Sequence, residues 1–463
     1  MGIHFMTSIA NIGFPFRLLK SYLIEINRVW RFDEQSLQRY QNKALKSVVK
    51  FAYQTVPLYH RKYKQAGVHP SDIQNTADIH KLPFITKDDL RVNSAEDIIP
   101  QGRNQSDFFH LSTSGSTGKP VFVYWDSFSA IKSLEGYVRI LKAYGGKWSK
   151  SRIALVIDLE PGSIENTMFS SSLPSFLRKI IPMNNIRYVH IGEKPETIIQ
   201  KLSDFSPEFL GSDPNMLRKI AVLKNQGLGK DLNPQCIFSG GSMLDDYTKN
   251  YVQQVFSTKM MNIYGATEAG PLAFQCFKDS SYHIHSDYVF MEFLDDNQTP
   301  VQLNTPGSLV VTKLYGSGTP IIRYTGIEDY ITPTDTQTSC GITTQMISQI
   351  EGRKADMIKL PNDSLLSPLT LTGIPAKIME KYNTYKIKQF QIIQHKKDYV
   401  ECILVFDKQL KDKGVSIKTI MNETRQRLEK NLGKEITIVV TEKDTLFDNT
   451  RSDYIKVVVS KVT

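Results

Sequence analysis

The sequence lacks the long apolar run that a membrane-spanning helix requires, which is about 18 residues or more. Cysteine is also scarce: the 463 residues include only Cys236, Cys276, Cys340 and Cys402, too few for a disulfide framework. The first 23 residues contain no uninterrupted apolar core followed by a small-residue cleavage site, so we expect no secretory signal. These absences predict a protein without a membrane span that works in a reducing compartment, the cytoplasm.

Long runs of basic residues are absent as well. Lysine and arginine number 57 against 47 acidic residues, which gives a net charge of +10, yet no run of five or more basic residues occurs. The sequence also has no stripe in which aromatic and basic residues alternate, so we expect no nucleic-acid partner. A dispersed positive charge suits an enzyme whose ligands are phosphorylated anions.

The sequence contains the alternating pattern of an α/β protein. From about residue 108 to 320, short apolar runs alternate with helical stretches, and most runs end in Gly, Ser or Asp, as strands do before a helix or a ligand loop. The strand candidates are IALVI (153–157), RYVHI (187–191), EFLGS (208–212), QCIFSG (235–240) and MMNIYG (260–265).

The flanking segments carry other patterns. Residues 34–66 have apolar positions at helical spacing, and in LPFITKDDL (82–90) Thr86 is placed to cap a new helix. From about 285 to 350 the pattern is β-rich, with YVFMEFLDD, GSLVVTKLY and PIIRYTG as strand candidates.

A shorter module follows Glu351. Its segment QFQIIQHKKDYVECILVF has the pattern of a β-hairpin, 417–432 is helical, and two β-branched strands follow. Because the chain is too long for a single core, we expect a large domain with mixed β-sheets and helices over 1–352 and a small α+β domain over 353–463.

The strongest local signal is the segment LSTSGSTGKP (111–120). Its glycines let backbone N–H groups face a phosphate oxygen, the hydroxyls add donors, and the lysine adds positive charge. It is not a Walker A loop, because Pro120 follows the lysine and VFVYW then reads as a strand instead of a helix. The segment predicts a phosphate loop between two strands, and the alternative is a flexible Ser/Gly turn.

Three more segments follow this loop in order: YGATE (264–268), IIRYTGIED (321–329) and EGRKADMIKL (351–360). Together the four resemble the adenylate-forming superfamily of acyl- and aryl-CoA ligases, luciferases and peptide-synthetase adenylation domains. LPFITKDDL and LPNDSLLSPLTL (360–371) narrow the resemblance to the phenylacetate–CoA ligase and capsule-biosynthesis branch (CapK-like, coenzyme F390 synthetase-like). The resemblance runs from about Tyr59 to the end of the chain.

The resemblance implies ATP-dependent activation of a carboxylic acid through an acyl-AMP, with ATP and Mg²⁺ as cofactors and CoA as acceptor. It divides the large domain into a helical lead-in (1–105) and a nucleotide- and acyl-binding core (106–350), and it makes the C-terminal domain mobile. The implied ATP-binding residues are Ser114, Gly115, Ser116, Thr117, Gly118 and Lys119 for the phosphates, Tyr264, Gly265 and Ala266 near adenine, and Asp329 and Arg353 for the ribose. Gly240 and Gly241 would let the backbone approach the adenine or the acyl group. Thr267 and Glu268 would orient the α-phosphate, with Glu268 as the Mg²⁺ ligand.

Some positions depart from the family pattern. Glu328 stands beside Asp329 and competes with it for the ribose, and Ala355 occupies the hinge position where Asp or Lys is usual. The catalytic candidates are Lys119, Thr267, Glu268 and a lysine near the C-terminus, for which Lys456 is the first choice and Lys461 the second.

The resemblance also implies a zinc site. Cys276, His283 and Cys340 stand where related sequences carry metal ligands, but Thr338 replaces the expected fourth, cysteine ligand. His285 is a candidate for the fourth position, since structural zinc takes four ligands. The alternative is a vestigial site without metal.

Three functions remain open. The first is an acyl- or aryl-CoA ligase, whose partners are a small carboxylic acid, ATP and CoA. The second is an adenylate-forming enzyme with another acceptor, such as an amino sugar, and the third is a non-catalytic nucleotide-binding homologue. A homodimer is compatible with the resemblance.

Overall fold

The computed structural model describes residues 24–113, 120–160, 163, 166, 184–336, 338–384, 386–408, 410–446 and 457–462. The chain divides into two compact units. The first comprises Met1–Ser242, Val255–Ile327 and Ile331–Gln349, and the second Met243–Gln254, Glu328–Tyr330 and Ile350–Thr463. Within the described ranges, no helix combines the length and the apolarity needed to cross a bilayer.

The first unit opens with the helices expected over 34–66. Helix α2 (Glu34–Thr55) begins where the Asp33 carboxylate accepts a hydrogen bond from the Ser36 N–H, which caps the first turn. Its buried face is mainly apolar at helical spacing. It ends at Val56 because Pro57 cannot continue the ladder but can start α3 (Pro57–Gln65) at its first position.

Shorter helices follow these two. In α4 (Lys87–Val92), the Thr86 hydroxyl accepts from the Asp89 N–H and the Asp89 carboxylate accepts from the Thr86 N–H, so the predicted cap is confirmed as a capping box. The other helices of this unit are α5 (Ala95–Ile98), α6 (Ser127–Ala143), α9 (Pro195–Phe205) and α10 (Pro214–Asn225), with 3₁₀ turns η2 (Arg28–Trp30), η3 (Pro70–Asp72), η4 (Thr76–Lys81) and η5 (Gln105–Asp107).

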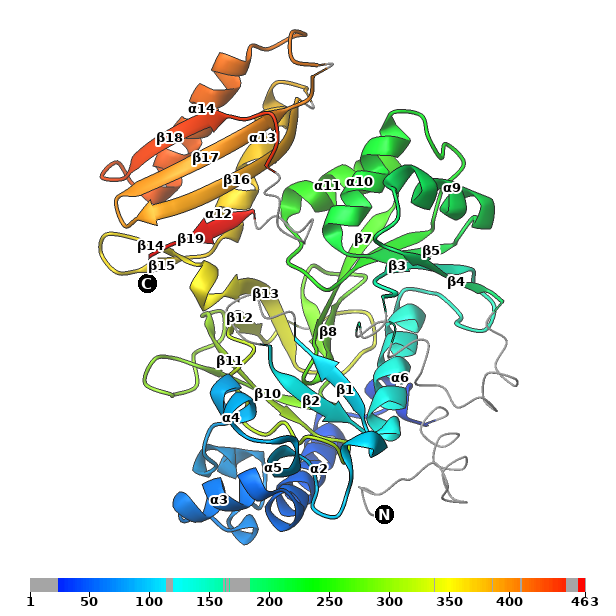
Figure 1. The fold of residues 1–463 in the computed structure, drawn as a ribbon, viewed down its shortest axis with the longest axis vertical. Coiled ribbons are helices and arrows are strands. Elements are labelled where there is room, and N and C mark those ends of the chain that lie inside the picture. The colour runs from blue at the N-terminus through cyan, green and yellow to red at the C-terminus, as the bar shows by residue number, and fades with distance from the viewer. Residues whose placement is uncertain are drawn as a thin grey trace. The chain divides into compact units, whose positions relative to one another are not determined.

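An eleven-stranded sheet, whose strands are labelled in Figure 1, has the order β10-β11-β12-β13-β9-β8-β7-β6-β5-β3-β4. The pairs β3-β4, β3-β5, β5-β6 and β6-β7 are parallel, and the pairs β7-β8, β8-β9, β9-β13 and β10-β11 are antiparallel. The parallel strands are β3 (Ile153–Ile157), β4 (Ile186–His190), β5 (Phe209–Ser212), β6 (Cys236–Ser239) and β7 (Lys259–Ala266). The others are β8 (Gly270–Gln275), β9 (Tyr282–Ile284), β10 (Val289–Leu294), β11 (Gly307–Lys313), β12 (Asp329–Thr334) and β13 (Met346–Arg353).

The sheet explains the strand patterns in the sequence. All five expected strands form, and they pair in parallel, with their apolar runs buried in the sheet and α9 packed on β3 and β4. The expectation for PIIRYTG was wrong, since this segment makes only isolated bridges from Tyr324 to Ile85 and to Val311. Its backbone turns at Arg323, which has a left-handed φ of +48°. The mixed α/β fold class is confirmed.

The second unit has a four-stranded sheet of its own, in the order β18-β17-β16-β19. The predicted hairpin is confirmed as the antiparallel pair of β16 (Ile387–Lys396) and β17 (Tyr399–Phe406). The remaining elements are α11 (Asp246–Phe256), which begins in this unit, η7 (Lys354–Asp356), β14 (Ile358–Lys359), β15 (Leu365–Leu366), α12 (Leu369–Thr372), α13 (Ile374–Lys381), α14 (Ile417–Leu432), β18 (Thr437–Glu442) and β19 (Val458–Ser460). One apolar core, with Phe390, Leu404 and Leu428 in it, joins the sheet to its helices.

Candidate functional site

The phosphate-loop candidate connects two strands, as expected. Strands β1 (Phe109–Ser112) and β2 (Phe122–Trp125) pair in antiparallel register, with Ser112 opposite Phe122. Beyond this pair, the Thr113 N–H donates to the Val121 carbonyl at 3.0 Å, and the Val121 N–H donates to the Thr113 hydroxyl at 3.0 Å. Residues 114–119, from Ser114 to Lys119, lie outside the described residues, so their predicted contacts with phosphate stay a prediction.

Glu268 lies in the turn between β7 and β8. The turn is closed by the Ala269 N–H, which donates to the Ala266 carbonyl at 3.2 Å. The Glu268 side chain is buried, and one of its carboxylate oxygens accepts a hydrogen bond from the Tyr324 hydroxyl at 2.9 Å. Hydrogen bonds to an ionised group are shorter and stronger than neutral ones, so this contact fixes the carboxylate in place.

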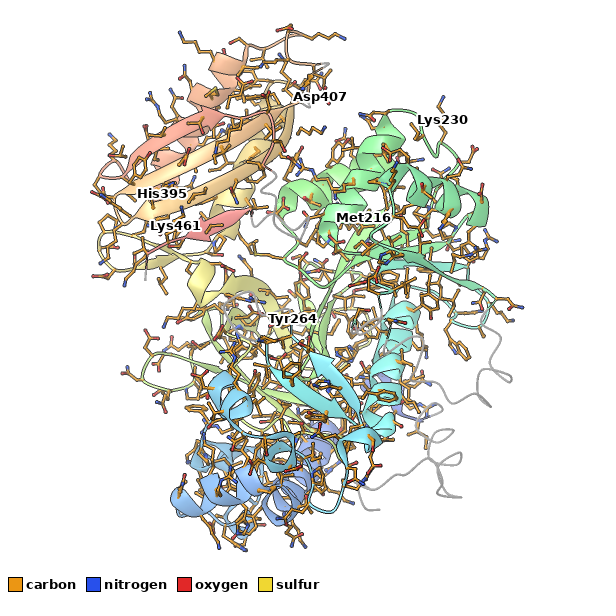
Figure 2. The ribbon with its side chains drawn as sticks, in the orientation of Figure 1. Met216, Lys230, Tyr264, His395, Asp407 and Lys461 are labelled. Carbon is orange, nitrogen blue, oxygen red and sulfur yellow. The ribbon has the colours of Figure 1, made fainter. Side chains whose placement is uncertain are left out.

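Of the other residues of YGATE, Tyr264, Gly265 and Ala266 are the last three residues of β7, and Thr267 follows in the turn. Tyr264 is buried near the end of this strand, and a bulge falls between it and Gly265 (Figure 2). Gly270 then starts β8 with a left-handed φ of +83°, and a Cβ there would meet the Trp125 ring at 3.0 Å and the Tyr315 hydroxyl at 3.1 Å. The left-handed φ and the lack of space for a Cβ both require glycine at position 270.

Gly240 and Gly241 lie beside this turn. They follow β6, the parallel neighbour of β7, and the Gly240 N–H donates to the Ser212 carbonyl at 3.3 Å. A Cβ on Gly240 would lie 3.4 Å from the carbonyl of Ile263, the residue before Tyr264. The glycine pair and the Glu268 turn therefore share the carboxyl ends of parallel strands, where open α/β sheets bind ligands.

Sequence reasoning missed the residues that hold Tyr324 in place. Tyr324 is fully buried, and the N–H of the following Thr325 donates to the Ile85 carbonyl at 2.9 Å. On its other side, Arg323 makes a buried two-oxygen ion pair with Glu292 and donates to the Leu82 carbonyl at 2.7 Å. These hydrogen bonds hold the segments IIRYTG and LPFI against each other. The only indication of this contact in the sequence was that both segments belong to the family pattern.

A buried cation also escaped the sequence prediction. The Lys313 ammonium lies 3.8 Å from the centroid of the Trp125 ring and 4.6 Å from that of Tyr315, and burial lowers its pKa to about 7. The Tyr315 hydroxyl donates to the Ala269 carbonyl at 3.4 Å. Lys132 is likewise buried, with its pKa lowered to about 8 mainly by desolvation. Both lysines lie against the ring of Tyr315, the residue whose hydroxyl contacts the turn at Ala269.

The ribose candidates belong to the second unit. Asp329 begins β12 and Arg353 ends β13, its neighbour in the sheet. The Lys354 N–H donates to the Glu328 carbonyl at 3.0 Å, so a backbone hydrogen bond joins the residue after Arg353 to the residue before Asp329. Ala355 lies within the 3₁₀ turn η7.

Of the two candidate catalytic lysines near the C-terminus, the structure describes only Lys461. Lys461 follows β19, where its N–H donates to the Gln394 carbonyl at 2.8 Å (Figure 2). Lys456 lies outside the described residues, so its catalytic role stays a prediction.

The metal candidates do come together, in the first unit. One ligand atom from each of Cys276, His283 and Cys340 lies within 4.8 Å of the other two. The His283 Nε2 atom is 3.1 Å from the Cys340 sulfur, while its Nδ1 atom is 3.3 Å from the Thr344 hydroxyl. The Thr338 hydroxyl lies 2.9 Å from the Cys340 sulfur. Two thiols and an imidazole with a hydrogen-bonded second nitrogen fit the donor chemistry of zinc.

His285 does not join this cluster, so its candidacy as a ligand was wrong. Strand β9 ends at Ile284, and the alternation that would align the two histidines stops there. Instead, the His285 Nδ1 atom is 3.0 Å from the Arg139 guanidinium, which makes a fully buried ion pair with Asp287 at 2.7 Å. Burial and the neighbouring guanidinium lower the pKa of His285 well below its usual value.

Comparisons with known proteins agree with the motifs. No protein-family model matches the chain. It is 29% identical over 296 residues to the phenylacetate-coenzyme A ligase of Escherichia coli strain K12, a match that covers 62% of this chain and 65% of that ligase. It is 24% identical over 312 residues to protein CapK of Staphylococcus aureus, which covers 66% and 65% of the two chains. The match thus spans 65% of the length of these relatives.

A solved structure supports the fold. The structure of 2-hydroxyisobutyryl-CoA ligase in the postadenylation state has a TM-score of 0.75 and 17% identity, and the alignment covers 93% of this chain and 90% of that one. At this identity the likeness concerns the fold. The resemblance to phenylacetate–CoA ligases and CapK that the motifs predicted is therefore confirmed, and so is the fold that it implied.

Proposed function

We propose that this chain is an ATP-dependent, AMP-forming ligase that activates a carboxylic acid as an acyl-adenylate and passes the acyl group to coenzyme A. The observation that carries the proposal is the buried Glu268 turn, which Tyr324 anchors beside the Gly240–Gly241 pair at the carboxyl ends of parallel strands. Relatives named phenylacetate-coenzyme A ligase support the same assignment.

The chemistry accounts for the residue types. The substrate carboxylate attacks the α-phosphate of ATP, a P–O bond forms to the acid, and pyrophosphate leaves. Negative charge grows on the phosphorus centre and on the leaving group, so catalysis depends on positioning and on charge neutralisation. Glu268 supplies a hard oxygen ligand for Mg²⁺, which would neutralise part of that charge. We assign Lys119 to the leaving pyrophosphate and Tyr264 to adenine.

Two further residues are assigned to the nucleotide. Asp329 and Arg353 are our candidates for the ribose hydroxyls, since a carboxylate accepts and a guanidinium donates hydrogen bonds. Lys456, or failing it Lys461, would meet the α-phosphate. Conversion of Arg353 to Met is expected to raise the KM for ATP without changing the melting temperature. An unchanged KM would remove Arg353 from the site.

A different acceptor is the second candidate. The likeness to CapK and the alanine at position 355 favour an enzyme that forms an acyl-AMP but transfers the acyl group to an amine, such as an amino sugar. Chromatography of reactions with acid, ATP and CoA separates the two, because only the first candidate produces an acyl-CoA. The same experiment with amine acceptors tests the second.

Acid-dependent exchange of pyrophosphate into ATP tests the proposal itself. We expect Glu268→Gln to lower the exchange rate by about 10²-fold or more, as loss of a positioned charge does in phosphoryl sites. Glu193→Gln is the matched control, because Glu193 is on the surface and pairs only with Lys201 in the contacts described. If no acid in an aromatic and aliphatic panel supports exchange, the chain is a non-catalytic homologue.

We further propose that Cys276, His283 and Cys340 hold a zinc ion through three protein ligands. Zinc would link β8 and β9 to the loop before β13, from which Cys340 comes. We expect about one equivalent of zinc by elemental analysis and less than half of it in Cys340→Ser. Cys236→Ser removes a buried thiol outside the cluster and should leave the zinc content unchanged. Protein without zinc after purification in reductant and zinc salts would end this proposal.

We also infer a cytoplasmic location from the thiols. All four cysteines are free, and metal-binding thiols need a reducing compartment. Recovery of the protein in a secreted fraction would contradict this.

A further inference from the structure

A cavity of about 140 Å³ lies against the Cys276–His283–Cys340 cluster in the first unit. Its lining includes the three ligand residues. The rest of the lining is mainly aromatic and aliphatic, with one lysine; its residues are Trp30, Lys142, Ala143, Phe274, Phe277 and Ile342. This lining contains no carboxylate and none of the residues assigned to ATP, so the cavity is a separate feature of the molecule.

The protein supplies three strong ligands to this site. Among the described residues, the metal-ligating group consists of Cys276, His283 and Cys340, and the nearest further donor is the Thr338 hydroxyl, 2.9 Å from the Cys340 sulfur. A neutral hydroxyl is a much weaker zinc ligand than a thiolate. Zinc sites that accept external ligands have three protein ligands and a fourth position whose ligand can exchange.

The three ligands are held in place from outside the cluster. The Thr344 hydroxyl at 3.3 Å from His283 Nδ1 leaves the Nε2 atom to face the sulfur atoms. The Lys278 N–H donates to the Cys276 sulfur at 3.4 Å, which helps to hold that sulfur in place. These contacts hold the three protein ligands in place for a metal ion, and the cavity lies beside them.

Charge and polarity limit what the cavity accepts. A divalent ion with two thiolates and a neutral imidazole has no net charge, so an added anion leaves one negative charge. The Lys142 ammonium can compensate it; in this structure it contacts the Asn27 side chain and lies 4.9 Å from the centroid of the Trp30 ring. The apolar remainder of the wall suits a short hydrocarbon group and disfavours a fully hydrated ion.

We propose that this metal site binds a small thiol from the cavity, as a thiolate that takes the fourth coordination position. A thiolate matches the two soft sulfur ligands already present, and its short apolar tail would fill the cavity. The inference rests on the metal site proposed above and not on the ligase activity.

Cobalt spectroscopy of the full chain tests this, because cobalt(II) reports the number of sulfur ligands. In protein with one equivalent of Co²⁺, ethanethiol is expected to raise the sulfur-to-cobalt charge-transfer absorbance by about half, from two thiolates to three. Ethanol has the same tail without sulfur and should give no change. Lys142→Met should raise the ethanethiol concentration for half the effect by about threefold or more.

Thr338→Cys is the decisive variant. It supplies a third protein thiolate, so its absorbance should already equal that of the ethanethiol-treated parent and should not respond to ethanethiol. A parent protein that binds cobalt and ignores ethanethiol refutes the inference, as does an equal response in Thr338→Cys. Failure to bind cobalt, with two thiols lost to a Cys276–Cys340 disulfide, refutes it together with the metal site. Pyrophosphate exchange on the same preparations reports the ligase proposal separately.

Discussion

Conversion of Tyr324 to phenylalanine removes one hydroxyl from the buried side of Glu268 and leaves the ring in place. The lost contact is a 2.9 Å hydrogen bond from a fully buried phenol to a buried carboxylate. A hydrogen bond to a charged group contributes about 1.5–3 kcal/mol. Because about 1.4 kcal/mol corresponds to a tenfold change in rate, we expect acid-dependent pyrophosphate exchange to fall about 10- to 150-fold.

The design separates positioning from stability. Tyr315→Phe is the matched control, since Tyr315 is also buried, but its hydroxyl donates only to the neutral Ala269 carbonyl at 3.4 Å. That variant should change the exchange rate by less than about threefold. In Tyr324→Phe the loss should appear in kcat and in the Mg²⁺ concentration required, with little change in the KM for the acid. Exchange within about twofold of the parent in a folded Tyr324→Phe protein would refute the role of Tyr324 as the anchor of Glu268.

Other predictions concern stability, measured by urea unfolding. The pKa of Lys313 is about 7 in the fold, against an ordinary lysine value of 10.5. Between these pH values the unfolded chain binds more protons than the folded one, so the free energy of unfolding rises with pH by up to about 1.4 kcal/mol per pH unit. In Lys313→Met this rise should be absent, and a pH profile equal to that of the parent would contradict the burial of Lys313. Gly318→Ala would push a Cβ into the Tyr124 carbonyl and should cost about 1–3 kcal/mol; no loss would mean that the backbone yields easily. Asp287→Asn leaves the buried Arg139 guanidinium without its charge partner and should cost about 3–5 kcal/mol, so a loss below about 1 kcal/mol would contradict the importance of the pair.

Local patterns were sufficient to predict many elements of this fold. The sequence expectation for IALVI coincides with β3 (Ile153–Ile157), and the helix expected over 417–432 coincides with α14. The cap at Thr86 also formed as expected. The helix and the Thr86 cap depend on residues within a few positions of one another, and the apolar run of β3 was sufficient to predict a strand although its partners β4 and β5 are distant in the sequence.

The failures depended on distant partners. PIIRYTG has a strand-like composition, but its bridges to Ile85 and Val311 are isolated, and Arg323 turns the backbone away. His285 was misplaced because its environment is set by Arg139, 146 residues away. Pairings of this kind are decided by the tertiary fold, and a pattern in one short segment does not contain them.

The candidate site also combines residues that the sequence motifs predicted with contacts that they did not. Family motifs pointed to Glu268 and to the cluster of Cys276, His283 and Cys340, and the structure brings the three metal candidates together. The motifs did not reveal that Tyr324 anchors Glu268 across 56 residues, or that Lys313 is buried near the same turn. Those facts follow only from the packing of β11 and the braced IIRYTG segment.

The central claim is that the Glu268 turn serves acid activation by ATP. Its most direct measurement is the exchange of labelled pyrophosphate into ATP by the purified chain, with and without each carboxylic acid of a panel. We predict exchange that requires an acid and Mg²⁺ and that falls about 10²-fold in Glu268→Gln. Exchange absent with every acid, or equally fast in Glu268→Gln, would contradict the claim.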